Sequence, residues 1–218
     1  MSTTPTPTPG SETERLITRR EAAETAERMR DINGRRTSSL RAVRGYEDLT
    51  GADLAGADMR GMKLVRVNLT GAILTDARLE GADLTNATLR SANMNGAYMG
   101  NVRLNGADLT DADLSNAILT GADLTGANLT NATLILASLQ VANLIRANLT
   151  GANLTSAKLG YALLTCANLT RAKLVNSDLS NADLTGADLT DANLRFANLA
   201  FSTFELANLT RVDMGDGE

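Results

Sequence analysis

Every fifth residue from Leu49 to Met214 is Leu, Met or Phe, which gives 34 pentapeptides in a row without insertion or deletion. Two positions before this residue, 27 of the 34 repeats carry Ala. Five residues turn an α-helix by about 500°, so the large side chains would spread over every side of a helix. In a straight strand, an odd period would send alternate Leu residues to opposite faces. The large side chains share one core only if the chain turns once per repeat, so that each pentapeptide forms one side of a coil.

The residue after each Leu indicates how many pentapeptides complete one coil. With a period of 20, one column of these positions holds Thr at eight of nine places from Thr50 to Thr210, and Arg90 is the exception. The other columns hold two Thr of nine, one of eight and four of eight. Four pentapeptides per coil stack this Thr column into a ladder, which suits a β surface. The sequence therefore predicts an all-β solenoid with about 8.5 four-sided coils and a length of roughly 41 Å.

The other positions of the repeat have physical roles in such a coil. Leu fills the interior, and Ala points inward where the walls come too close for a larger side chain. The residue between Ala and Leu is mostly Asp or Asn, as in Ala107-Asp108-Leu109, and its side chain can bond nearby backbone groups at the corner. Gly, which is frequent in the second position after Leu, relieves the turn.

The Ala-(Asp/Asn)-Leu-x-x pattern resembles that of the pentapeptide repeat family and covers residues 46–214, about three-quarters of the chain. This resemblance implies a right-handed quadrilateral β-helix. Most members of the family have no known activity. The best understood are bacterial proteins that bind DNA gyrase as DNA mimics and protect it against quinolones.

The segments outside the repeats lack the five-residue pattern and are expected to have other structures. Residues 1–10 contain all three prolines and predict a disordered Thr/Pro tail. Residues 11–45 are expected to form a cap over the open edge of the first coil, with a short α-helix over 11–32. Ser11 and Glu14 match a capping box at its start, and Asn33-Gly34 supplies a stop. A helix that recruits a partner is the alternative. Residues 215–218 are a short tail.

The composition argues against an enzyme. Histidine is absent and Cys166 is the single cysteine, which removes the commonest general base, internal disulfides and cysteine-based metal clusters. A solenoid packed with Leu and Ala offers no cleft in which carboxylates would be desolvated for catalysis. We therefore predict no catalytic, cofactor or metal site. Neither a signal peptide nor a run of 18 apolar residues is present, so we expect a cytoplasmic protein with no membrane partner.

Two groups of large apolar residues interrupt the polar surface and are candidate contact sites. The first, which we call the partner patch, lies in the middle coils and comprises Ile118, Ile135, Leu136, Val141, Ile145, Tyr161 and Leu163. The second lies near the C-terminus and is the expected interface of a homodimer; its members are Phe196, Phe201, Phe204, Leu206 and Val212.

The charge of the repeats weighs against DNA mimicry. Residues 46–218 carry a net charge of −7, whereas about 41 Å of duplex DNA carries roughly 24 negative charges. When the charged residues are sorted by side of the coil, no side has a net charge more negative than −2. The first expectation is therefore a non-enzymatic structural or protein-protein interaction scaffold, with an unidentified protein partner and no direct contact with nucleic acid. A DNA-mimicking inhibitor or protector of gyrase, or of another type II topoisomerase, is the alternative.

Overall fold

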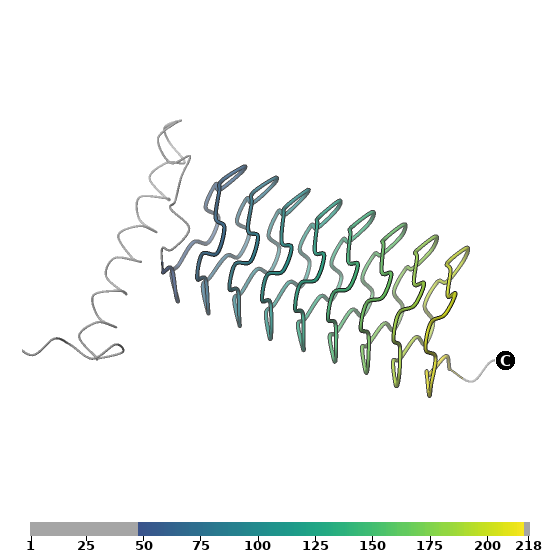
Figure 1. The fold of residues 1–218 in the computed structure, drawn as a ribbon. Coiled ribbons are helices and arrows are strands. Elements are labelled where there is room, and N and C mark those ends of the chain that lie inside the picture. Colours follow the sequence, from purple (N-terminus) through teal and green to yellow (C-terminus); the bar gives the residue numbers. More distant parts are fainter. Residues whose placement is uncertain (1–47, 216–218) are drawn as a thin grey trace, which may run out of the picture.

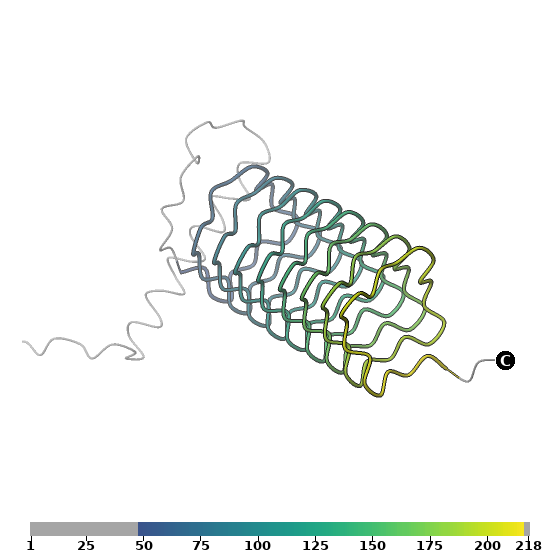
Figure 2. The same cartoon turned by 45° about the vertical axis from the view of Figure 1, so that its right-hand side comes forward.

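The computed structural model describes residues 48–215 of the 218-residue chain. These residues wind into one straight stack of similar coils, which runs from Asp48 at one end to Gly215 at the other (Figures 1 and 2). The Thr/Pro tail, the cap segment with its short helix, and residues 216–218 lie outside the described residues.

Single bridging residues hold neighbouring coils together. Thirty isolated parallel bridges join residues that are 20 apart, from Asp48↔Asn68 to Asn193↔Asp213. One coil therefore takes 20 residues, or four pentapeptides, and the β-solenoid prediction is confirmed. Within residues 48–215 there is no α-helix, and no strand is longer than a single bridging residue. We name the four walls of a coil after their first bridging residues: wall A begins at Asp48, wall B at Asp53, wall C at Asp58 and wall D at Lys63, and each recurs every 20 residues.

The backbone hydrogen bonds repeat with the same period. The N–H of Leu54 donates to the carbonyl of Ile73 on the next coil at 2.7 Å, and the N–H of Ile73 donates back to the carbonyl of Ala52 at 2.8 Å. Within one turn, the N–H of Ala52 donates to the carbonyl of Leu49 at 3.0 Å. These bonds recur along the shaft, so the backbone groups that point along its axis are satisfied by the adjacent coils.

The core is a stack of Leu and Ala layers. The large residue of every repeat from Leu49 to Leu194 is at most 2% exposed, and most of the Ala residues before them are fully buried. Each buried Leu contributes roughly 1.5–3 kcal/mol, and contacts between adjacent coils make the contributions cooperative. Ser177 replaces Ala in one layer and donates its hydroxyl hydrogen to the carbonyl of Leu174 at 2.8 Å. The sequence therefore predicted correctly which residues point inward.

The four corners of each coil share one unusual backbone conformation. The second residue after each Leu or Met has a positive φ at all 33 positions from Gly51 to Arg211, with values between 52° and 68°. Together with the hydrogen bond that closes the turn, a positive φ at the third residue is the signature of a type II turn. Gly, Asn or Asp occupies 20 of these 33 positions, and these are the residue types that tolerate this conformation best.

Candidate functional site

Six corner positions carry large apolar side chains instead of Gly, Asn or Asp. We call them the apolar corners: Leu136, Val141, Tyr161, Phe196, Phe201 and Leu206, with φ between 52° and 61°. A left-handed conformation costs an ordinary residue about 1–2 kcal/mol, and it is least favourable for a β-branched residue such as Val141. All six side chains are also exposed, by 55% at Leu136 and Val141 and by 91% at Leu206. Neither backbone preference nor burial accounts for these residues.

The partner patch is centred on wall C and the two corners that flank it. Ile118 lies on wall C, Leu136 at the corner between walls B and C, and Val141 and Tyr161 at the corner between walls C and D. Tyr161 lies directly above Val141, one coil later. The remaining members occupy the adjoining walls, Ile135 on wall B and Ile145 and Leu163 on wall D. The seven predicted residues thus spread over three adjacent walls, and four of them lie on wall C or at its two corners.

The C-terminal group does not form one continuous surface. Phe204 and Val212 point inward and pack, half-buried, against the end of the core. Phe196, Phe201 and Leu206 point outward from three successive corners, and the two Phe residues are 76% and 86% exposed. Phe196 lies in the same corner column as Leu136, and Phe201 lies in the same column as Val141 and Tyr161. Wall C is therefore flanked by large apolar side chains both in the middle of the shaft and near its C-terminal end.

The charges along the shaft are segregated in a way that sorting by side does not reveal. No Asp or Glu occurs between Asp123 and Asp178, and residues 124–177, which we call the acid-free band, hold only Arg146, Lys158 and two other basic residues. The net charge of this band is +4, whereas residues 178–218 carry eight acids against two bases. The band coincides with most of the partner patch. A count along the chain, rather than around the coil, would have found it from sequence.

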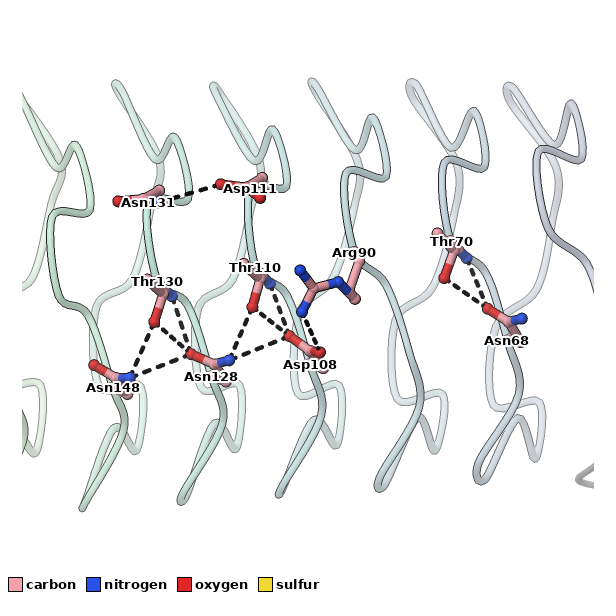
Figure 3. A network of polar contacts seen from close by, with 10 residues as sticks. All are labelled: Asn68, Thr70, Arg90, Asp108, Thr110, Asp111, Asn128, Thr130, Asn131 and Asn148. Carbon is pink, nitrogen blue, oxygen red and sulfur yellow. Dashed lines mark hydrogen bonds and ion pairs between the residues drawn. The ribbon is translucent and has the colours of Figure 1, made fainter.

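Wall A has a different character, because it is lined by a polar network (Figure 3). The hydroxyl of Thr130 donates to Asn128 Oδ1 at 2.6 Å, and Asn128 Nδ2 donates to Thr110 Oγ1 on the previous coil at 2.8 Å. Arg90 interrupts the Thr column and instead forms an ion pair with Asp108 at 3.1 Å. These contacts stay within the chain, so wall A stabilises the shaft and leaves few free groups for a ligand.

The carboxylates of the shaft act as hydrogen-bond acceptors at the turns. The hydroxyl and N–H of Thr185, with hydroxyl groups from Thr203 and Thr165, lower the pKa of Asp183 to about 2. The Arg211 guanidinium likewise lowers the pKa of Asp191, with which it forms an ion pair. Groups held in the ionised form in this way are poor general acids near neutral pH. Their arrangement supports a structural role.

Between residues 48 and 215, no group of three or more Cys, Asp or Glu residues is arranged to hold a metal ion. In the same range there is no helix long and apolar enough to cross a membrane.

Comparison with known proteins agrees with the repeat geometry. The family model described as pentapeptide repeats matches residues between 48 and 216, in eight copies. The crystal structure of HetL, a pentapeptide repeat protein involved in heterocyst differentiation regulation from the cyanobacterium Nostoc, is 33% identical; the match covers 78% of this chain and 86% of HetL, with a TM-score of 0.44. Rfr23 from the cyanobacterium Cyanothece is 37% identical over 42% of this chain and 60% of its own, with a TM-score of 0.40.

A third similar structure is QnrB1, a plasmid-mediated fluoroquinolone resistance protein. It is 18% identical, the match covers 78% of this chain and 82% of QnrB1, and the TM-score is 0.42. Among curated protein sequences, no match to this chain is found.

Proposed function

Because the chain belongs to the pentapeptide repeat family, we propose that it is a non-enzymatic scaffold that binds another protein through the partner patch. The observation that carries this proposal is the set of large apolar side chains held exposed at left-handed corners. Strained residues of this kind persist where function, rather than stability, retains them. We also propose that the coils wind in a right-handed sense and that the protein is cytoplasmic.

The chemistry of the surface indicates what kind of partner it fits. Leu136, Val141 and Tyr161 offer apolar contact area, while Lys158 and Arg146 add positive charge within a band that lacks acids. A complementary partner presents apolar side chains together with carboxylates. Charged groups at the rim of such a contact chiefly govern specificity and the rate of association.

A binding experiment tests this proposal directly. The immobilised chain is compared with an Ile145→Thr/Leu163→Asn variant, in which both new residue types already occupy the same columns of the shaft, at Thr125 and Asn143. Proteins retained from an extract of the native organism are identified, purified and titrated against both chains. We expect the variant to lose at least tenfold in affinity while its thermal unfolding is unchanged. Equal binding by the two chains would contradict the proposed surface.

The gyrase alternative receives less support. A DNA mimic presents negative charge along its length, whereas the middle of this shaft carries +4 over residues 124–177. A DNA supercoiling assay separates the two functions, because a scaffold of the proposed kind leaves gyrase activity unchanged. Inhibition of supercoiling at micromolar concentration would favour the alternative.

We also propose that the chain forms a homodimer through its C-terminal coils. The exposed Phe196 and Phe201 support this, because adjacent exposed aromatic residues are typical of contact surfaces between proteins. The inward members of the group, Phe204 and Val212, would contribute only if the open end of the core were itself covered.

A further inference from the structure

Wall C carries two pairs of apolar corners that are separated by three coils. In the first pair, Leu136 and Val141 flank the wall from opposite corners; in the second pair, Phe196 and Phe201 flank it from the same two corners. A spacing of about 4.8 Å between coils places the two pairs roughly 14 Å apart along the shaft. The same side of the molecule thus presents apolar contacts at two levels.

Two opposite charges lie between these levels, one on each intervening coil. Lys158 and Asp178 are bridging residues of wall C and are directly paired in the ladder. Lys158 is exposed and takes part in no ion pair within residues 48–215. Asp178 is half-buried and accepts hydrogen bonds from Asn198 Nδ2 and from the N–H of Ser180, both at 3.0 Å. From one end to the other, the strip therefore reads apolar pair, positive charge, negative charge, apolar pair.

We propose that a second copy of this chain docks on wall C, antiparallel to the first and related to it by a two-fold axis. The axis runs across the wall, midway between the coils of Lys158 and Asp178. A rotation about such an axis reverses the direction of the shaft and keeps each corner on its own side. Leu136 then faces the partner's Phe196, and Val141 faces the partner's Phe201. Lys158 faces the partner's Asp178, and the symmetry repeats every contact.

This register is specified by charge as well as by shape. A parallel side-by-side pair would place each copy at the same height, so that Lys158 would lie opposite Lys158 and Asp178 opposite Asp178. Like charges in such a contact are unfavourable, whereas the antiparallel register joins opposite charges. The wider charge distribution agrees in sign, because the acid-free band of one copy, with net charge +4, lies beside residues 178–215 of the other, with net charge −4. Of these charged residues, Lys158 and Asp178 are the ones on wall C.

The middle of wall C also allows close approach. Between the apolar corners, its outward positions include Ser138, Gly160, Ser180 and Ala200, which are small. In this register the longer side chains of the wall meet small ones, because Gln140 faces the partner's Ala200 and Asn198 faces the partner's Ser138. Lys158 and Asp178 are the one pair of long side chains that meet there. Tyr161 adds a polar contact, because it faces the partner's Asn181, whose amide can bond the phenol hydroxyl.

This inference rests on the proposed homodimer and specifies its surface, the side of the shaft rather than its end. The second copy covers the wall C part of the partner patch, so in the dimer the other protein binds through the wall D members Ile145 and Leu163. Sedimentation equilibrium of the full chain tests the charge pair. We expect Lys158→Glu and Asp178→Lys each to weaken the dimer at least tenfold, and the double variant to return to within about threefold of the wild type. The control Lys173→Glu, on wall B, leaves dimerisation unchanged. A double variant as weak as the single variants would overturn the antiparallel register.

Disulfide trapping distinguishes the side from the end even if charge reversal perturbs folding. In a Cys166→Ser background, Val141→Cys and Phe201→Cys chains are oxidised separately and as a mixture. The expected product is a cross-linked pair in the mixture and little in either chain alone. Efficient self-linking of the Phe201→Cys chain alone would overturn the inference and indicate an end-to-end contact. A wild type that stays monomeric at high micromolar concentration would overturn both this inference and the proposed homodimer, while leaving the heterologous scaffold intact.

Discussion

The side-chain amide of Asn148 donates a hydrogen bond of 3.0 Å to Thr130 Oγ1 on the preceding coil. The same hydroxyl donates to Asn128 Oδ1, two residues earlier in the chain, at 2.6 Å. One Thr hydroxyl thus joins a turn to the next coil, and Figure 3 shows the equivalent pattern at Thr110. The Thr column seen in the sequence therefore links adjacent coils on wall A at Thr110, Thr130 and Thr190.

Removal of this hydroxyl gives the first prediction. Thr130→Val keeps the shape of the side chain but leaves Asn128 and Asn148 without a shared partner. We expect it to lower the free energy of unfolding by about 1 kcal/mol more than the control Thr155→Val, in chemical denaturation. The hydroxyl of Thr155 bonds only within its own turn, to Asn153 Oδ1 at 2.7 Å. Equal losses from the two substitutions would show that the cross-coil link adds nothing to stability.

The second prediction concerns the small inward residue. Ala127 is fully buried, and a larger side chain there would push two packed walls apart. Ala127→Leu should destabilise the shaft by roughly 1–3 kcal/mol through overpacking. Thr125→Ala, on the outside of the same coil, should cost far less, although it loses one hydrogen bond to Asp123. Thermal unfolding of both variants decides the matter, and the reverse ranking would contradict the roles assigned to these two positions.

The sequence was sufficient for the architecture because the period of five and the period of 20 each have a single physical solution. They predicted Leu54 and Ala57 as inward residues and placed Thr110, Thr130 and Thr150 in one column. They placed a turn at the second position after Leu, where Gly is frequent, but they did not show which conformation the apolar residues at that position adopt. Only the backbone shows that Leu136 and Val141 occupy left-handed corners. The period of 20 does place Phe196 in the column of Leu136, because the two residues are 60 positions apart.

A third prediction follows from that corner conformation. Val141 has a φ of 52°, which a β-branched residue tolerates poorly and Asn tolerates well. Val141→Asn should raise the free energy of unfolding by about 1 kcal/mol. The matched control is Asn101→Val in the same corner column, where φ is 53°, and this substitution should destabilise by a similar amount. A Val141→Asn variant that melts below the wild type would mean that the valine contributes packing that outweighs its strain.

The last prediction concerns acid. The pKa of Asp183 is lowered to about 2, first by the hydroxyl of Thr185 and then by its N–H, with Thr203 and Thr165 adding hydroxyl groups from the adjacent coils. A carboxyl with a lowered pKa in the folded state stabilises the fold fully above its unfolded value near 3.9, and this stabilisation is lost as the pH falls toward 2. Asp183→Asn keeps an acceptor oxygen but does not titrate. We therefore expect the difference in unfolding midpoint between wild type and variant to be constant from pH 6 to pH 5 and to shrink between pH 4 and pH 2. Parallel denaturation curves across that range measure it, and a difference that does not depend on pH would show that the carboxylate charge at this turn does not stabilise the shaft.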